Sequence, residues 1–413
     1  MPSSRGMMMD PNGAEPVHTV SVLSVARQPG CPFDPPEELT RARRHGPISR
    51  CLLPGGRQGW LVTGYDLVRS VLADSRFMCI RGLTLDSYVD IGDVVVPPVA
   101  PGEFTFMDEP QHSRYRKLLA GEFTVRRMRM LTESIERVTA DHLDAMDKGG
   151  PPTDLVTAFA EPIPAIMICE LLGVPYQDRG SFQAQSATLF NGDASAEEQL
   201  AAYTALREYI ARLVAVKRAH PTGDVLGDLT TSDLTDEELT GAGFLLLAAG
   251  LDTTSNMLAF GTFALLSHPG QWAALHADPA LADKAVEELM RYLSVAKTFM
   301  RTALEDVELG GQTITAGTTV LLSLHTANRD PRRFPQPDTL DIERQAIGHL
   351  GFGHGRHQCP GQQLARVVMR VAFPALVNRF PTLRLDVPPE AIDLHPETAD
   401  VFGVHSLPVA WDA

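Results

Sequence analysis

The segment from residue 236 to residue 267 constrains the fold more than any other part of the sequence, because it is apolar nearly all the way round a helix. A helix of this kind is buried in the interior of a protein. Thr235 and Glu238 have the spacing of a capping box at its start, and His268-Pro269-Gly270 is a stop signal at its end. The sequence therefore predicts one long helix at the centre of the molecule.

Apolar residues at three- and four-residue spacing recur along most of the chain and predict a mainly helical protein. Short strand-like segments lie in only two places, at 60–62 and between 307 and 322, where glycines mark the turns. No linker, repeat or low-complexity tract divides the chain. We therefore expect a single domain over residues 1–413, with residues 1–20 weakly ordered. The expected helices cover 114–119, 128–147, 200–218, 237–267, 281–293 and 362–379.

The composition is ordinary for a soluble enzyme, since 44% of the 413 residues are hydrophobic and 21% are charged. The polar N-terminal segment carries neither a membrane-spanning run nor a signal-peptide pattern, so we expect a cytoplasmic protein without a membrane anchor. Five dispersed cysteines fit a reducing compartment better than a disulfide framework. A formal net charge of −15 argues against nucleic acid as a partner, and we expect a monomer.

Residues 352–361 place one cysteine, Cys359, in a glycine-rich loop directly before a helix-like segment. Glycines keep other side chains away from the sulfur, and the N-terminus of the following helix stabilises a thiolate. A lone axial thiolate is the ligand that lets haem iron cleave dioxygen. A buried core cysteine is the plain alternative. A zinc site formed with His349, His354 and His357 is another, although this spacing fits zinc poorly.

The loop resembles the haem-binding signature of the cytochrome P-450 family, and the resemblance extends from about residue 30 to the C-terminus. It implies the triangular fold of that family, mainly α with a small β-sheet region. Haem b would lie between the long central helix and the helix after the loop, with Cys359 as the metal ligand and Phe352, His357 and Gly361 beside the cofactor. The fixed positions of the signature are matched by Phe352, Gly353, Gly355, His357, Cys359 and Gly361.

The middle of the long segment, Ala249-Gly250-Leu251-Asp252-Thr253, resembles the oxygen-activation motif of the same family. Gly, Asp and Thr are poor choices inside a helix, so a buried helix that keeps them has a use for them. The Thr253 hydroxyl can bond the carbonyl of Ala249 and open a gap that accepts dioxygen. The resemblance makes Thr253 and Asp252 the catalytic pair, with Asp252 linking the site to solvent protons and Ala249 beside the haem. On the motif alone, a helix kink with a solvated Asp252 is the alternative.

Four residues match the cationic side chains that hold the haem propionates in the family. His112 and Arg116 are four residues apart and share a helix face. Arg301 begins the run Arg301-Thr302-Ala303-Leu304-Glu305-Asp306, and His357 precedes Cys359 by two residues. Each of the four, taken alone, is more often a solvated surface residue. The four are assigned to the propionates because their positions relative to the other motifs match those of the family.

A buried ion network is predicted on the other side of the haem. Glu288 and Arg291 are three apart on one helix face, a spacing that permits pairing. Surface helices carry such pairs often, but in the family this pair is completed by an arginine before the cysteine loop. Arg344 stands at the matching position. We expect this triad to be structural rather than catalytic.

Four apolar regions are expected to enclose the substrate. The stretch 79–104 is apolar and irregular, as functional loops often are, and by resemblance it joins 181–218, 294–299 and 401–404 in the pocket wall. Such a lining suits a large lipophilic ligand. Lys297 pairs with an anionic group of the substrate or, alternatively, points to solvent. The candidate pocket residues are Leu83, Tyr88, Val94, Val96, Phe190, Leu245, Ala248, Val295, Lys297 and Phe402.

The function implied by the resemblance is that of a haem-thiolate monooxygenase, inserting one oxygen atom into a polyketide, macrolide, terpenoid or steroid by hydroxylation or epoxidation. Oxidative coupling, desaturation or peroxide-driven oxidation on the same scaffold is the alternative, and a non-catalytic ligand-binding or zinc protein is a remote one. Nothing in the sequence resembles a flavin or iron–sulfur domain, so electrons would come from an acidic ferredoxin and its NAD(P)H-dependent reductase. A basic cluster of Arg126, Arg127, Arg129 and Lys117 is the expected docking site, or else a solvated basic face.

Overall fold

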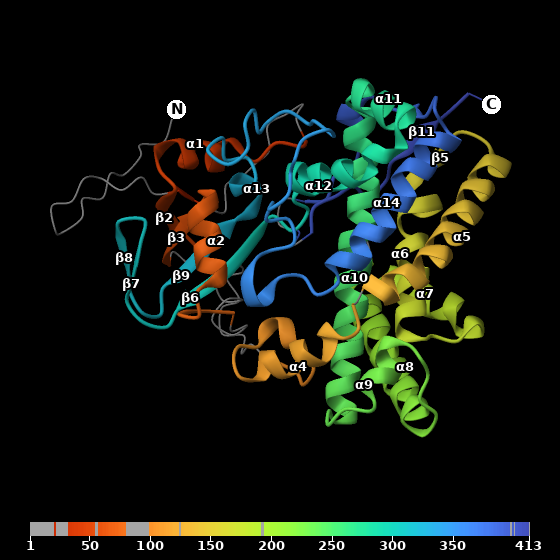
Figure 1. The fold of residues 1–413 in the computed structure, drawn as a ribbon, viewed down its shortest axis with the longest axis horizontal. Coiled ribbons are helices and arrows are strands. Elements are labelled where there is room, and N and C mark those ends of the chain that lie inside the picture. Colours follow the sequence, from red (N-terminus) through yellow and green to blue (C-terminus); the bar gives the residue numbers. More distant parts are fainter. Residues whose placement is uncertain are drawn as a thin grey trace.

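The computed structural model describes residues 20–21, 32–53, 57–79, 99–123, 125–190, 194–396, 399 and 401–412. Most of the long helices, α5 to α8 and α14, lie on one side of the molecule, and the six-stranded sheet with α1, α2 and α13 lies on the other, with α10 between them (Figure 1). Residues 1–20, predicted to be weakly ordered, lie largely outside the described residues. The predicted pocket loop, 79–104, lies partly outside them. The helices are α1 (Glu37–His45), α2 (Tyr65–Ala73), α4 (Gln111–Ala120), α5 (Val125–Gly149), α6 (Pro162–Leu172), α7 (Arg179–Phe190), α8 (Ala196–Ala219), α9 (Val225–Leu229), α10 (Asp236–Leu266), α11 (Pro269–Ala277), α12 (Ala282–Leu293), α13 (Leu324–Ala327) and α14 (Gln362–Arg379).

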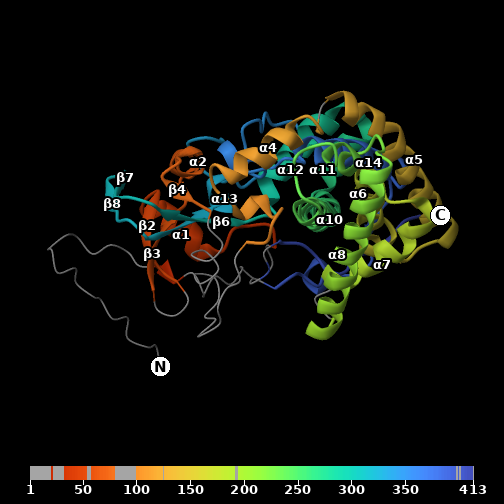
Figure 2. The ribbon, with the colours of Figure 1, turned by 90° about the horizontal axis from the view of Figure 1, so that it is seen from below.

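The long central helix is α10, and its start is the predicted capping box. The Thr235 Oγ1 accepts from the Glu238 backbone amide at 3.2 Å, while the Glu238 carboxylate accepts from the Thr235 amide at 2.8 Å. A cap of this kind stabilises a helix by about 1 kcal/mol. The helix ends at Leu266, before Pro269 begins α11. Figure 2 looks nearly along α10 and shows α6, α8, α12 and α14 arranged around it.

Three small sheets flank the helices. The largest has six strands in the order β1-β2-β3-β9-β6-β4 and contains the predicted strands 60–62, in β3, and 320–322, in β9. The first part of the second predicted region forms β7 and β8, which make a separate two-stranded sheet. Strands β3 and β9 pair in parallel, with Trp60 opposite Val320. The strands are β1 (Val20–Ser21), β2 (Ile48–Leu52), β3 (Gln58–Val62), β4 (Phe77–Met78), β5 (Thr153–Asp154), β6 (Thr298–Ala303), β7 (Val307–Leu309), β8 (Gln312–Ile314), β9 (Thr319–Ser323), β10 (Arg384–Leu385) and β11 (Pro408–Ala410).

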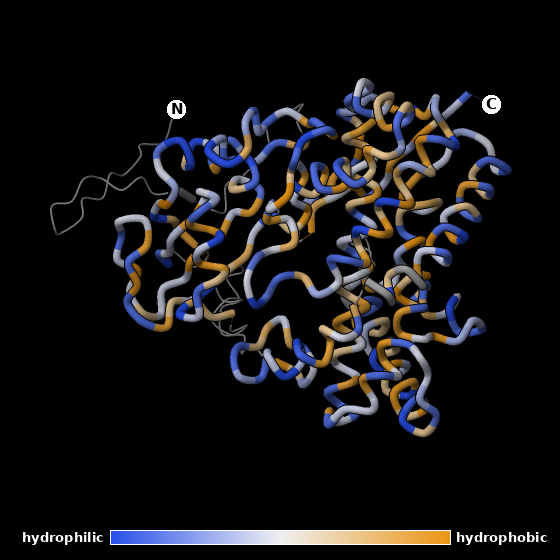
Figure 3. Tube along the Cα trace, viewed as in Figure 1, coloured by the Kyte–Doolittle hydropathy of each residue, from blue (hydrophilic) through white to orange (hydrophobic). Residues whose placement is uncertain are grey.

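The apolar core follows the helices, as the hydropathy colouring shows (Figure 3). One large cluster of buried side chains surrounds α10, and a second fills the space between the six-stranded sheet and α2. In the described part of the chain, α10 alone is long and apolar enough to cross a membrane, but 67% of its apolar window is buried inside the protein. It is therefore the core helix that the sequence predicts. The prediction of a mainly α fold with a small β-sheet region is confirmed.

Candidate active site

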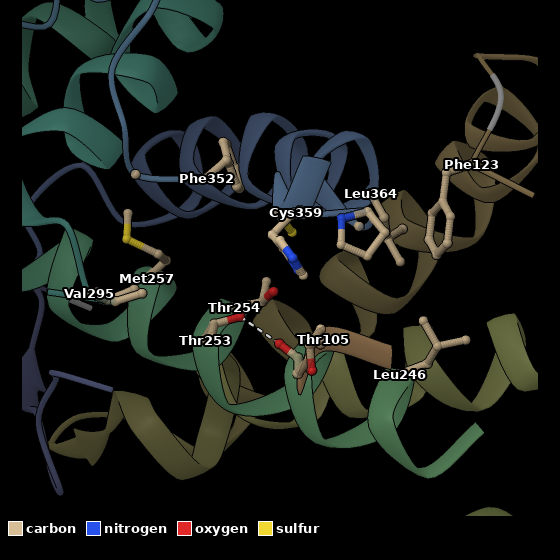
Figure 4. Close-up of a pocket in the computed structure, with 18 of the residues that line it drawn as sticks. Thr105, Phe123, Leu246, Thr253, Thr254, Met257, Val295, Phe352, Cys359 and Leu364 are labelled. Carbon is tan, nitrogen blue, oxygen red and sulfur yellow. Dashed lines mark hydrogen bonds between the residues drawn. The ribbon is translucent and has the colours of Figure 1, made fainter. Parts of the chain in front are cut away.

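An apolar cavity of about 400 Å³ lies between α10 and the loop that carries Cys359, together with the start of α14 (Figure 4). The sulfur of Cys359 faces it from one side, and Thr253 of α10 faces it from the other. Most of the remaining wall is aliphatic or aromatic. It includes Phe104, Phe106, Phe123, Met167, Ile168, Leu246, Met257, Val295, Phe299, Leu364 and Val368.

The loop fixes Cys359 at the N-terminus of α14. Its backbone amide donates to the Phe352 carbonyl at 2.9 Å, and Gly361 is the N-cap of the helix. Gly355 has φ +73°, and a Cβ there would lie 2.5 Å from the Leu72 carbonyl oxygen, so the tight loop needs glycine at this position.

Burial raises the pKa of the Cys359 thiol, while the backbone amides of Gly361 and Gln362 and the guanidinium of Arg116 oppose that rise. Amides at a helix N-terminus and nearby arginines favour the thiolate, the form that binds a metal. Among the described residues, no group of three or more His, Cys, Asp or Glu side chains could hold a metal ion, and His349 lies 3.1 Å from Glu287 instead of near the sulfur. The arrangement therefore supports a single thiolate ligand and not the zinc alternative.

Cationic and imidazole groups line the cavity beside the thiolate. The rings of His112 and His357 lie 4.0 Å apart between centroids, and Arg116 and Arg301 reach the same space. The Nδ1 of His112 and both ring nitrogens of His357 are buried and have no hydrogen-bond partner in the described structure. A carboxylate lies near each ring, beyond hydrogen-bond distance: Asp108 is 3.6 Å from the Nε2 of His357, and Glu109 is 3.8 Å from the Nδ1 of His112.

Burial, the neighbouring His357 and Arg116 lower the pKa of His112 to about 4. Buried polar atoms without partners are rare and call for a missing partner. An anionic group in the cavity would supply one to His112 and His357 and would stabilise the charged form of both. The donor set, one thiolate and four cationic or imidazole side chains, therefore fits haem with its iron on Cys359 and its two carboxylates among the four residues predicted to hold them.

The helix α10 runs without a break through the oxygen-activation motif, where the Thr253 side chain bonds to the preceding turn. The Thr253 hydroxyl donates to the Ala249 carbonyl at 2.8 Å, as its position in the sequence predicts, and both residues line the cavity (Figure 4). Asp252 does not line it. Its carboxylate accepts from the Asn256 amide at 2.8 Å, and it faces a different, polar cavity on the neighbouring face of α10. Thr253 and Asp252 therefore face two separate cavities, Thr253 the apolar one and Asp252 the polar one.

The structure brings the predicted triad together in a buried site. Arg291 donates to both carboxylate oxygens of Glu288 at 2.7 and 2.8 Å, and neither side chain has any exposed surface. Arg344 reaches the same carboxylate at 3.1 Å. Arg291 also donates to the carbonyls of Asn328 and Pro337, so it ties α12 to the segment that leads into the cysteine loop.

A second ion network beside the triad was not found from the sequence. Glu287 accepts from Arg366 at 2.5 and 3.0 Å and lies 3.1 Å from His349, and the Arg366 guanidinium stacks 4.4 Å from the Phe352 ring. Hydrogen bonds from His349 and Arg366 outweigh burial and lower the pKa of Glu287 to about 2. The sequence did contain a signal for this network, because Glu287 and Glu288 are adjacent acids on one helix. Adjacent side chains on a helix point in different directions, so two such acids need different partners.

The predicted substrate contacts divide into three groups. Val295 lines the cavity, whereas Leu245, Ala248, Lys297 and Phe402 are not among its lining residues. Phe402 packs edge-on against Phe260 at 5.0 Å, and the Lys297 amine lies 5.7 Å from the Phe402 ring. Leu83, Tyr88, Val94 and Val96, and the side chain of Phe190, lie outside the described residues.

The predicted basic cluster is only partly available for docking. The Arg127 side chain is held in ion pairs with Glu122 and Asp228. Lys117 is exposed on α4, and the side chains of Arg126 and Arg129 lie outside the described residues.

Comparison with known proteins places this geometry in a family. Residues 224–409 match the model of the Cytochrome P450 family. Cytochrome P450 105C1 of a Streptomyces species is 47% identical over 92% of this chain and 96% of its own length. Pentalenic acid synthase of Streptomyces avermitilis is 40% identical over 92% of this chain and 95% of its own length.

Solved structures give the same result. A point mutant of CYP105P1 superposes with a TM-score of 0.89 at 40% identity, covering 96% of this chain and all of the other. CYP105P1 in complex with filipin I has a TM-score of 0.86 at 39% identity, covering 96% of this chain and 99% of the other. The chain belongs to the cytochrome P450 family of monooxygenases, which bind haem b through a cysteine thiolate.

Proposed function

We propose that this enzyme inserts one atom of dioxygen into a lipophilic secondary metabolite, by hydroxylation or epoxidation. The observation that carries the proposal is the cavity itself, in which the Cys359 sulfur and the Thr253 side chain face each other across an apolar space. The thiolate provides a ligand for haem, the threonine a proton-donating group, and the apolar wall a place for the substrate.

Haem bound at Cys359 would supply the activation of dioxygen, and the chain's own residues set the conditions for it. Cys359 would bind the iron as thiolate, with Phe352 and Gly361 beside it. His112, Arg116, Arg301 and His357 would hold the two carboxylates. The triad Glu288, Arg291 and Arg344 fixes the segment before the loop.

Thr253 lines the cavity one turn from Ala249, where its hydroxyl would orient dioxygen and pass on a proton. Asp252 holds protons for it on the neighbouring face of α10. This division keeps charge out of the substrate space while leaving a proton donor one residue away.

The names of relatives support the substrate class. They include pentalenic acid synthase and nocardicin C N-oxygenase, and a related structure contains filipin I. We assign this chain a polyketide, macrolide, terpenoid or steroid of similar bulk. The proposed pocket residues remain Leu83, Tyr88, Val94, Val96, Phe190, Leu245, Ala248, Val295, Lys297 and Phe402, to which the cavity adds Phe104, Phe106, Leu246 and Met257.

We further propose that electrons arrive from an acidic ferredoxin and its NAD(P)H-dependent reductase, that the enzyme is a cytoplasmic monomer, and that Lys117 contributes to docking. The support is the absence of any flavin or iron–sulfur motif in the sequence together with the exposed lysine on α4.

The test has two stages. The reduced, haem-loaded protein should give the red-shifted carbon-monoxide spectrum of a thiolate ligand, and Cys359→Ser should abolish it while the buried Cys169→Ala control keeps it. The parent enzyme, supplied with ferredoxin, reductase, NADPH and a panel of macrolides and terpenoids, should then give a product heavier by one oxygen from isotopically labelled dioxygen. A product lacking two hydrogens, or a coupled product, would contradict oxygen insertion.

A further inference from the structure

A second cavity, of about 590 Å³, lies between α10, α6, α7 and the segment 395–405, and it shares no lining residue with the apolar cavity. Figure 2 shows α6 and α7 on the same side of α10. We name this space the polar chamber. Its titratable and amide-bearing lining residues are Glu161, Gln183, Asp252, Asn256, His395 and His405.

The inner end of the polar chamber is fixed at Asp252. The Asn256 amide donates to the Asp252 carboxylate at 2.8 Å and to its backbone carbonyl at 3.0 Å, one turn away on α10. Asn256 is itself clamped by the chain opposite, because a Cβ at Gly403 would overlap its side-chain oxygen. The carboxylate therefore has one orientation, toward the polar chamber, while the next residue faces the apolar cavity.

Glu161 stands at the outer end, at an unusual point of the backbone. Residues 156–160 form a π-helical turn, and the Glu161 amide bonds the Val156 carbonyl five residues back at 3.0 Å. Such widened turns are rare and gather at functional sites. In the described structure the Glu161 carboxylate has no hydrogen-bond or ion-pair partner, and the residue is exposed, so the polar chamber is in contact with solvent at this point.

Partial desolvation against the chamber walls and the nearby charge of Asp154 both raise the pKa of the Glu161 carboxyl group above its ordinary value. His395 and His405, with ring centroids 4.5 Å apart, are the other titratable groups that face the polar chamber besides Asp252. A water occupies about 30 Å³ of liquid, so the space has room for a chain of waters between polar side chains.

We infer that the polar chamber is the proton supply of the active site, with Glu161 passing protons from solvent through bound water to Asp252, positioned by Asn256. The inference rests on the proposed function. Oxygen insertion takes R–H, one O₂, two electrons from reduced ferredoxin and two protons, and gives R–OH and one water. The C–H and O–O bonds break, one oxygen ends in R–OH, and the two protons end in the water. Those protons must cross α10, and Asp252 is the residue that faces the chamber next to Thr253.

The test compares two oxidants in the haem-loaded enzyme, with ethoxycoumarin as the substrate probe. With ferredoxin, reductase and dioxygen, protons must be taken up, whereas hydrogen peroxide brings its own two protons and two electrons. We expect Glu161→Gln to slow the dioxygen-driven reaction by about tenfold, at the lower edge of the roughly 10²–10⁴-fold effect of a general acid itself. Peroxide-driven turnover should stay at the parent level. Glu161→Asp should recover most of the loss, and Glu136→Gln, the same change at an exposed residue of α5 outside the chamber, should behave as the parent.

A pH profile separates proton transfer from a structural role. The parent's dioxygen-driven rate should fall as rising pH deprotonates Glu161, and this limb should be missing in Glu161→Gln. Equal losses with both oxidants, or no loss with either, would overturn the inference while leaving the proposed function intact. A parent enzyme that oxidises the probe with neither oxidant would count against the proposed function, and the inference would fall with it.

Discussion

At the scale of single residues, Asp252 and Thr253 show how one step along a helix separates two kinds of chemistry. Successive side chains on a helix point about 100° apart. Thr253 therefore enters the apolar cavity while Asp252 enters the polar chamber. A charged carboxylate in the apolar cavity would have been costly to desolvate and would have competed with a lipophilic substrate.

The Thr253 hydroxyl can be tested by a substitution of equal shape. Thr253→Val should keep haem and ethoxycoumarin binding but divert electrons to hydrogen peroxide, lowering product per NADPH by about tenfold or more, since a positioned proton donor is lost. Thr253→Ser should restore most of the yield. Thr262→Val is the matched control, because Thr262 makes the same bond to its own helix, to Leu258 at 2.8 Å, outside the cavity. Unchanged coupling in Thr253→Val would contradict the assigned role.

The residues of the motifs could be predicted from the sequence, whereas among the described candidates for the pocket wall only Val295 lines the cavity. Cys359, Thr253, His112 and Arg301 all reach the cavity, because a motif fixes type and position together. The prediction took Leu245 and Ala248 of α10 as lining, whereas Leu246 and Ala249 line the cavity. A helix that is apolar on every side gives no signal for which face meets a cavity, so such choices depend on packing that the sequence pattern does not show.

At the scale of elements, six of the helices were predictable from periodicity, whereas others, among them the amphipathic α1 and α2, were not. The six helices predicted from periodicity lie within or close to α4, α5, α8, α10, α12 and α14. Helix α6 was not predicted, because Pro162 and Pro164 read as breakers and its residues are nearly all buried. The π-helical turn before it leaves no periodic signature, although it sets the direction of Glu161.

The triad joins α12 to the segment before Cys359, and breaking it should unfold that connection. Arg291→Met would leave the fully buried Glu288 carboxylate without its main partner, at a cost of about 3–5 kcal/mol in the free energy of unfolding. Urea titration of the haem-loaded protein measures it, with loss of haem absorbance as a second signal. Arg212→Met is the control, since Arg212 is exposed in a loose pair with Glu208 and should cost less than about 1 kcal/mol. Equal stability of the two variants would contradict a buried network.

The neighbouring network predicts a dependence of stability on pH. Glu287 has a pKa of about 2 in the folded chain, below the ordinary 4.5. The stabilisation by its charge is therefore complete above about pH 4.5 and is lost as the pH falls toward 2, because the unfolded chain takes up the proton first. The full effect is roughly 3 kcal/mol. Urea titrations should show Glu287→Gln less stable than the parent at neutral pH, with the gap closing in acid.

The control for this pH effect is Glu136→Gln, because Glu136 is exposed on α5. That variant should follow the parent at every pH. A gap between Glu287→Gln and the parent that stays constant down to about pH 3 would show that Glu287 acts through packing and not through its charge.

At the scale of the whole molecule, one signature of ten residues predicted the architecture. Its resemblance to a haem-binding loop implies a fold in which the cofactor lies between the long central helix, α10, and the helix after the loop, α14. The position of the sheets followed less directly. Strand β3 pairs in parallel with β9 although more than 250 residues separate Val62 from Leu322, and no local pattern encodes such a pairing. The long-range arrangement came from the resemblance, and the local elements from periodicity.

The net charge of −15 should govern how the proposed acidic ferredoxin approaches. Two acidic proteins repel at long range, and salt screens that repulsion first, since the Debye length is about 10 Å at 0.1 M ionic strength. Short-range attraction to Lys117, exposed on α4, is screened only at higher salt. Ferredoxin-driven turnover should therefore rise and then fall as ionic strength increases, while peroxide-driven turnover of the same enzyme stays flat.

Lys117→Ala should raise the KM for ferredoxin by about two- to fivefold, which is what losing one exposed ion pair allows, and should leave kcat unchanged. Lys148→Ala, at the far end of α5 and equally exposed, is the charge-matched control and should match the parent. A ferredoxin KM that responds equally to the two variants would mean that total charge, and not a docking contact at Lys117, controls the encounter. The docking face would then have to be sought elsewhere around the cysteine loop.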